Sequence, residues 1–136
     1  MNWILCSMML DIKQLLRAKT LKIISVAYTL CITFLLLFPA TNVPEIDVPS
    51  FDKVGHVLVF AFLVIFWALF VFTKGKKALA KIWWVLFGAF IYGIIIEALQ
   101  GLFFESRTAD GWDIVANCAG ILFGWLVFQK IKNYLR

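Results

Sequence analysis

The chain alternates long apolar runs with short polar segments, and four of the runs are long enough to cross a membrane. They lie at about Leu21–Phe38, Val54–Phe72, Ile82–Phe104 and Trp112–Phe128. A spanning helix needs about 20 residues, with a working range of about 17 to 25. The first and fourth runs are at the short end, where tilt and flanking side chains help. No strand-like alternation competes, so the pattern predicts an all-α integral membrane bundle of four transmembrane helices.

Polar and helix-breaking residues separate the runs. Pro39 ends the first run, the segment TKGKK ends the second, and QKIKNYLR follows the fourth. We predict one membrane domain over residues 21–136, preceded by a basic segment over residues 1–20. Apolar and basic residues mix in that segment in a pattern suited to an interfacial helix. The alternative is a frayed leader that serves only to orient the chain.

Composition supports a membrane protein. The chain has 136 residues, of which 63% are hydrophobic and 15% charged, and its mean hydropathy is +0.93. A soluble domain is about half apolar and about a quarter charged, and one core of this size could not bury so much apolar surface. Cys6, Cys31 and Cys118 show no C-x-x-C spacing, so we predict packing residues rather than a zinc site or disulfide. Basic residues follow the segment NWILCSMML, which is the reverse of the order in a secretory signal.

Lysine and arginine gather on one side of the predicted bundle. The net charge of +5 could indicate a nucleic-acid partner in a soluble protein. Here, however, all 13 basic residues except Lys53 and Arg107 fall before or at the very start of the first run, between the second and third, or after the fourth. The positive-inside rule then places both termini in the cytoplasm. We therefore predict a multi-pass membrane protein with both termini in the cytoplasm and with no nucleic-acid partner.

Polar side chains that could take part in catalysis or binding fall on the opposite side of the predicted bundle. Asp52 and His56 are four residues apart where the second run begins, so they share a helical face. Glu97 lies about 22 Å along its run, in a core about 30 Å thick, and Gln100 follows one turn later. Residues expected at the same level are Lys53, Arg107, Asp110, Asp113 and Asn117. Together these residues predict an outward-facing polar pocket.

Glu97 carries the strongest functional signal. A carboxylate in the membrane core costs about 2.5 to 3.5 kcal/mol on insertion scales. Glu97 must therefore face the bundle and be protonated, paired or hydrated, and its candidate partners are Arg107, Lys53 and His56. The alternative is that Glu97 and Gln100 join helices through hydrogen bonds.

Structural explanations compete at other polar positions. Asp52 and Asp113 stand where a helix N-cap would, and capping alone could explain each. Asp110 precedes a glycine, which is a turn signal. His56 could be a satisfied interfacial histidine, and Asn117 could join helices.

Small residues predict close helix packing. Ala116, Gly120 and Gly124 recur every four residues and form a face on which helix backbones can approach each other. We expect Gly88 and Gly93 to serve the same end.

Three blocks of sequence carry a resemblance to a known family. They are FDKVGHVLVFAFL, IYGIIIEALQ and ESRTADGWDIVANCAGILFG. In this order they resemble the VanZ-like family of small bacterial membrane proteins, over about residues 39–128. The matching positions are Asp52, Lys53, His56, Gly93, Glu97, Gln100, Arg107, Asp110, Asp113, Asn117, Gly120 and Gly124. The resemblance implies an envelope role and a bearing on susceptibility to teicoplanin, a glycopeptide, but no particular reaction.

The first candidate function is an enzyme acting on an envelope lipid or a lipid-linked cell-wall intermediate. Glu97, His56 and Asp52 could supply the general acid and base, while Lys53 and Arg107 could hold a phosphate. The remaining predicted binding residues are Gln100, Asp110, Asp113 and Asn117.

Metal chemistry has a weaker signal in the sequence. A single histidine excludes a multi-histidine site, although carboxylates could hold a hard cation. The carboxylates concerned are Asp52, Glu97, Asp110 and Asp113. The sequence assigns no metal ligands and leaves the metal requirement open, and it specifies no cofactor.

Two other classes remain open. A binding or accessory protein would hold a lipid head or a glycopeptide in the same pocket without turnover. A proton-coupled transporter would use Glu97, but transporters need polar residues along the whole path, and the opposite halves of the second and third runs, such as VIFWALFVF and IWWVLFGAF, have no ionisable residue. The sequence does not indicate an oligomeric state.

Overall fold

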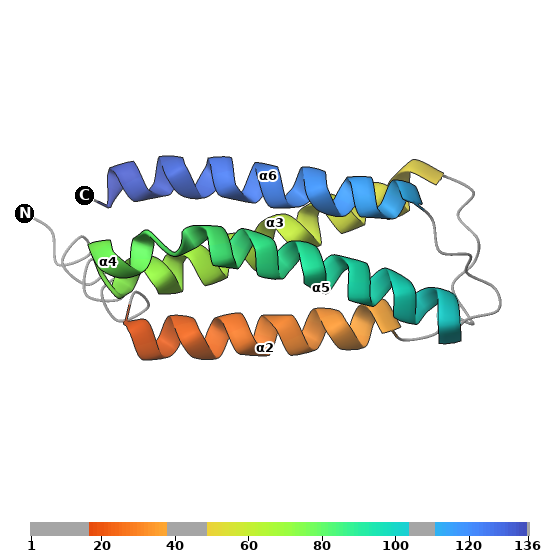
Figure 1. Cartoon of the computed structure of the whole chain (residues 1–136), viewed down its shortest axis with the longest axis horizontal. Helices are drawn as coiled ribbons and strands as arrows, with labels where there is room; N and C mark the ends of the chain where they lie inside the picture. The colour runs from red at the N-terminus through yellow and green to blue at the C-terminus, as the bar shows by residue number, and fades with distance from the viewer. Residues whose placement is uncertain (1–16, 38–48, 104–110, 136) are drawn as a thin grey trace, which may run out of the picture.

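The computed structural model describes residues 17–37, 49–103 and 111–135, with residues 49–52 described by their backbone only. Four long helices run along one axis (Figure 1): α2 (Ala18–Leu37), α3 (Pro49–Thr73), α5 (Ile82–Phe103) and α6 (Gly111–Tyr134). A short helix, α4 (Lys76–Leu79), lies between α3 and α5. All four long helices are long and apolar enough to cross a membrane. The prediction of an all-α bundle with four membrane spans is confirmed.

Three helices extend beyond the predicted runs. Helix α2 begins at Ala18, within the segment assigned to the basic N-terminal part; the predicted interfacial helix otherwise lies at residues 1–16, outside the described residues. Helix α3 begins at Pro49, because the fixed φ of proline suits the first helical turn. Helix α6 continues to Tyr134 through glutamine and lysine residues that are good helix formers.

The helices run antiparallel, which gives the bundle two different ends. At one end, which we call the site end, α2 and α5 finish while α3 and α6 begin; at the other, the basic end, α2 and α5 begin while α3 and α6 finish (Figure 1). Among the described residues, Lys53 is the one lysine or arginine near the site end. Those near the basic end are Arg17, Lys19, Lys22, Lys74, Lys76, Lys77, Lys81, Lys130 and Lys132.

Small residues bring α6 directly against α3. A Cβ added at Gly120 would lie 2.4 Å from the backbone oxygen of Val57, and one added at Gly124 would lie 2.5 Å from that of Ala61. These contacts confirm the predicted small-residue face. A Cβ added at Gly93 would come within 3.1 Å of the Phe60 ring, so Gly93 also serves close packing.

The prediction for Gly88 was wrong. Gly88 is exposed, and a Cβ added there would meet nothing within 4 Å. Its side of α5 borders an open space between α2, α3 and α5, where no neighbouring helix lies in contact with it. The reason is that α5 approaches α2 only toward the site end, one to two turns beyond Gly88 (Figure 1).

Apolar side chains fill the interior and also cover the outside. Phe60, Val64 and Ala68 of α3 are fully buried. Large apolar residues remain exposed on every long helix, including Leu30 at 67% and Trp84 at 72%. A soluble monomer rarely exposes so much contiguous apolar surface, whereas lipid chains would cover it.

Cys31 differs from the packing role predicted for the cysteines. Cys31 is exposed on the outer face of α2, and Cys118 is only partly buried. Both are free thiols. Cys6 lies outside the described residues. A thiol is apolar enough to face lipid, so its position in an apolar run did not require burial.

Candidate functional site

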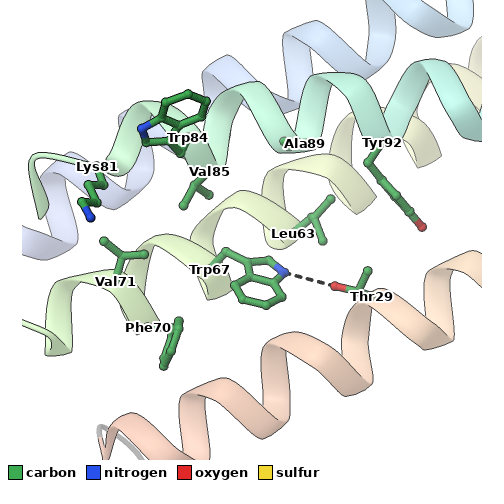
Figure 2. A pocket seen from close by; sticks show the side chains of 11 residues that line it. Thr29, Leu63, Trp67, Phe70, Val71, Lys81, Trp84, Val85, Ala89 and Tyr92 are labelled. Atoms are coloured by element: carbon green, nitrogen blue, oxygen red, sulfur yellow. Dashed lines mark hydrogen bonds between the residues drawn. The ribbon is translucent and has the colours of Figure 1, made fainter. Parts of the chain in front are cut away.

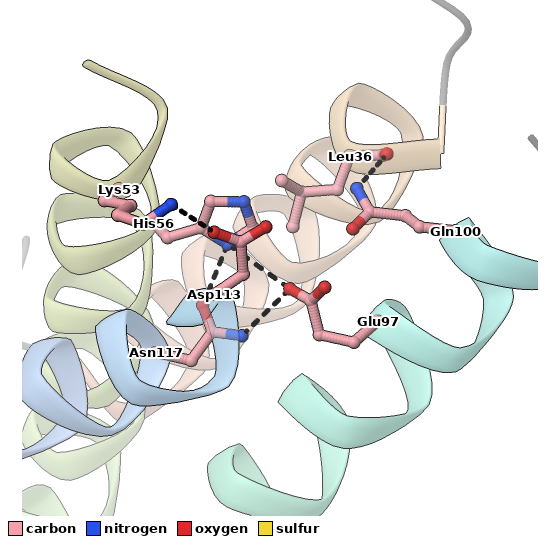
Figure 3. Close-up of polar contacts among 7 residues, drawn as sticks. All are labelled: Leu36, Lys53, His56, Glu97, Gln100, Asp113 and Asn117. Atoms are coloured by element: carbon pink, nitrogen blue, oxygen red, sulfur yellow. Dashed lines mark hydrogen bonds and ion pairs between the residues drawn. The ribbon is translucent and has the colours of Figure 1, made fainter. Parts of the chain in front are cut away.

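Three helices bring His56, Glu97 and Asn117 together inside the bundle near the site end (Figure 3). His56 comes from α3, Glu97 from α5 and Asn117 from α6. Their exposed fractions are 3%, 4% and 2%. We call these three residues the polar cluster.

Asn117 is the centre of the polar cluster. Its amide oxygen Oδ1 lies 2.9 Å from His56 Nδ1, and its amide nitrogen Nδ2 donates to Glu97 Oε1 at 3.4 Å. Because Oδ1 can only accept, His56 donates this hydrogen bond and carries its proton on Nδ1. The same Nδ1 lies 3.7 Å from Glu97 Oε1, within the range of an ion pair. The asparagine therefore orients both ionisable groups.

Small residues make this geometry possible. A Cβ added at Gly93 would lie 3.3 Å from Asn117 Nδ2, and Gly120 follows Asn117 by about one turn on the face that touches α3. The close approach of α6 to α3 sets the His56–Asn117 distance. The cluster thus depends on the backbone packing beside it.

A second pair lies at the rim of the polar cluster. Lys53 Nζ is 3.6 Å from Asp113 Oδ1, and their side chains are 37% and 14% exposed. Within the described residues, Asp113 Oδ1 accepts no hydrogen bond. Asp113 lies in the first turn of α6, which begins at Gly111, so it is not the N-cap that the sequence suggested. A negative charge there still interacts favourably with the helix dipole.

Gln100 contacts a different helix. Its Nε2 donates to the backbone oxygen of Leu36 at 2.7 Å, near the end of α2 (Figure 3). The last carbonyls of a helix have no partner within the helix. Gln100 therefore caps α2 and joins it to α5, and the structure does not bring it into the polar cluster.

The side chains of three predicted site residues are not among those that the structure describes. Arg107 and Asp110 lie outside the described residues. Asp52 lies in the first turn of α3, rather than at its N-cap, because that helix begins at Pro49. Of the partners predicted for Glu97, His56 lies beside it, and Arg107 lies outside the described residues.

A divalent cation could find ligands at this site. His56, Glu97 and Asp113 each offer a ligand atom, and these atoms lie within 4.8 Å of one another. One imidazole and two carboxylates form a set that transition metals accept. The sequence grouped the carboxylates without His56, since it could not show that α3 meets α5 here. Lys53 beside Asp113 would oppose a cation.

Sequence reasoning missed the polar side chains that attach α2 to the bundle. Thr33 Oγ1 and Tyr92 Oη lie 2.8 Å apart, Trp67 Nε1 donates to Thr29 Oγ1 at 3.1 Å, and Tyr28 Oη donates to the backbone oxygen of Val59 at 3.0 Å. The available signal was the recurrence of hydroxyl residues every four positions in the first run.

A cavity of about 610 Å³ lies away from the polar cluster, between α2, α3 and α5 (Figure 2). Leu63 and Val85 contribute to its largely apolar lining, and Lys81 lies at one end. The acid–base groups are absent from this lining. We therefore place the candidate chemistry at the polar cluster and treat the cavity as a separate feature.

No family model, curated protein or solved structure matches this chain. The site is therefore interpreted from its own geometry.

Proposed function

We propose that this four-helix membrane protein is a VanZ-like protein of the bacterial inner membrane that binds the polar head of an envelope lipid or a lipid-linked cell-wall component. The polar cluster and its rim would form the binding site. An effect on susceptibility to glycopeptides such as teicoplanin is part of this proposal, through the shared envelope ligand.

One observation carries the proposal. Each of the three sequence blocks that resemble the family contributes one residue to the polar cluster: His56, Glu97 and Asn117. These residues are far apart in the chain and belong to three helices. Ionisable groups buried among membrane helices are costly and are a functional hypothesis by default.

The charges at the rim favour a ligand that carries phosphate. Lys53 is partly exposed and could contact a phosphate oxygen while remaining near Asp113. An ammonium group is a common phosphate ligand. Arg107 would add a second cation in this proposal, and Asp52 and Asp110 would complete the binding surface.

Acid–base chemistry is available if the ligand is processed. Glu97 could accept a proton while His56 supplies one, because their polar atoms lie 3.7 Å apart. The substrate would enter from the site end, where Lys53 and Asp113 lie. Hydrolysis or transfer at a phosphate ester fits these groups.

Binding without turnover is the second candidate. It is supported by the burial of the three cluster residues, which are almost fully inaccessible and form hydrogen bonds with one another. In that case the cluster would hold α3, α5 and α6 in position beneath a headgroup. Transport is disfavoured, because Val64, Ala68 and Phe128 fill the described interior toward the basic end.

A lipid assay separates the first two candidates. Purified protein in liposomes of bacterial lipid extract would be compared with Glu97→Gln by mass spectrometry of every lipid species. We expect wild type to consume or retain a species that the variant does not, since glutamine keeps an acceptor for Asn117 but cannot give or take up a proton. Consumption indicates an enzyme, and retention without change indicates a binding protein.

A control variant tests whether the loss of any buried polar group changes the lipid profile. Ser25→Ala removes a buried hydroxyl whose hydrogen bond stays within α2, to Leu21 O. It should behave as wild type. Identical lipid profiles for wild type and Glu97→Gln, with both proteins folded, would remove the proposed role of Glu97.

The proposed orientation has an independent test. With the basic end in the cytoplasm, green fluorescent protein fused after the last residue should fluoresce, and alkaline phosphatase fused there should be inactive. Alkaline phosphatase inserted between Phe103 and Gly111 should be active. The reverse pattern would place the polar cluster in the cytoplasmic leaflet and contradict an outward-facing site.

A further inference from the structure

Helices α2 and α5 are joined at the site end and separate toward the basic end (Figure 1). The Thr33–Tyr92 hydrogen bond of 2.8 Å and the Gln100–Leu36 bond of 2.7 Å hold them together. Beyond these bonds the cavity of about 610 Å³ opens between the two helices, with α3 as its floor. We call this cavity the α2–α5 groove; it extends from Tyr92 to Lys81 along α5 (Figure 2).

The lining of the groove suits hydrocarbon. Leu63, Val85 and Ala89 supply aliphatic surface, and Trp67 supplies a large aromatic face. The Trp67 indole N–H is already bonded to Thr29 Oγ1 at 3.1 Å, so it does not require a polar ligand. A polar molecule inside the groove would lose hydration without compensating hydrogen bonds.

The groove is open at its side and charged at one end. Trp84 and Gly88 line it and are exposed, so lipid can enter laterally. Lys81 is the one charged residue among the lining residues, and it precedes the first residue of α5. Lys74, Lys76 and Lys77 are exposed near the same end. The basic end therefore favours an anionic headgroup.

The dimensions of the groove match one leaflet. The stretch from Lys81, which immediately precedes α5, to Tyr92 spans about 16 Å at the helical rise, and half of a hydrocarbon core is about 15 Å. The volume falls within the range of about 300–1,000 Å³ typical of ligand pockets. A single acyl chain could lie along the groove with its headgroup level with Lys81.

We propose that the α2–α5 groove binds a phospholipid with an anionic headgroup, with one acyl chain in the groove and the phosphate at the Lys81 ammonium. The acyl chain is in an apolar medium whether it lies in the groove or in the bilayer. Its transfer between the two therefore contributes little to the preference for one lipid over another. The interaction of Lys81 with a phosphate whose negative charge no headgroup ammonium balances supplies the selectivity for anionic lipids. This site lies at the opposite end of the bundle from the polar cluster and does not depend on its function.

Native mass spectrometry with defined lipids tests the proposal. Purified protein would be incubated with equal amounts of phosphatidylglycerol and phosphatidylcholine of identical acyl chains, and the retained lipids counted. We expect one phosphatidylglycerol per chain. Lys81→Gln should reduce the preference for phosphatidylglycerol about fivefold, the effect of one basic residue near the headgroup.

The second test variant, Gly88→Leu, fills the groove. Gly88→Leu places a side chain where an added Cβ meets nothing within 4 Å, so the bundle should fold while the acyl chain loses its space. We expect this variant to lose the retained lipid. Lys77→Gln is the matched charge control, because Lys77 is exposed and does not line the groove.

Three results would overturn the proposal. They are equal retention of both lipids by wild type, unchanged retention in folded Gly88→Leu, and a loss in Lys77→Gln as large as that in Lys81→Gln. Displacement of phosphatidylglycerol by an equal amount of oleate would also contradict it, since a fatty acid would then be the ligand. If Gly88→Leu does not fold, the comparison of the two lysine variants still decides.

Discussion

Gly120→Ala should lower the free energy of unfolding by about 1–3 kcal/mol, the usual cost of overpacking a well-packed interior. The added Cβ would lie 2.4 Å from Val57 O, 3.0 Å from Val57 C and 3.0 Å from Phe60 Cβ. Backbone atoms cannot rotate away as the end of a side chain can. Helix α6 must therefore move away from α3, and the His56–Asn117 hydrogen bond must lengthen with it.

Gly88→Ala provides the matched control on α5. An added Cβ there meets nothing within 4 Å, and alanine in a helix interior is favoured over glycine by about 0.5–1 kcal/mol. The two substitutions should thus have opposite signs when unfolding is measured in mixed detergent micelles. Equal effects would show that helix propensity, rather than contact between α3 and α6, determines the outcome.

Asn117→Leu should destabilise the bundle by about 1–3 kcal/mol, because it leaves buried polar groups without their partner. Leucine has a similar size but cannot bond His56 Nδ1 or Glu97 Oε1. Loss of both bonds should also release the orientation of His56. The proposed lipid activity should fall with it, even where the variant is folded.

Ser25→Ala is the control for Asn117→Leu. It shows whether the loss of stability comes from hydrogen bonds between helices or from the removal of any buried polar group. Ser25 is fully buried, but its hydroxyl donates to Leu21 O within α2 at 2.7 Å. Ser25→Ala should change the free energy of unfolding much less than Asn117→Leu does. If the two variants lose the same stability, hydrogen bonds between helices are not what holds the polar cluster together.

The functional residues were partly predictable. Glu97 was conspicuous because an ionisable side chain in an apolar run is costly in lipid. His56 and Asn117 could be placed at about the same depth by counting helical turns. Their contact could not be predicted, since a periodic pattern gives depth along a helix and leaves the pairing of helix faces open.

Gln100 and Gly88 illustrate that limit. Gln100 was expected to face the pocket with Glu97, yet it bonds Leu36 on α2. Gly88 was expected to pack closely like Gly93, yet it faces the α2–α5 groove. Both outcomes depend on the angle at which α5 crosses its neighbours. Lys81, at the end of the groove, was likewise interpreted from the sequence only as evidence for the orientation of the chain in the membrane.

The amino-acid sequence by itself determined that the chain is a bundle of four membrane helices with basic residues gathered at one end, because apolar length and charge placement govern insertion into lipid. Only the tertiary structure decided which polar side chains meet. Asn117 joins His56 to Glu97 because Gly120 lets α6 approach the α3 backbone. The groove exists because hydrogen bonds hold α2 and α5 together at one end only.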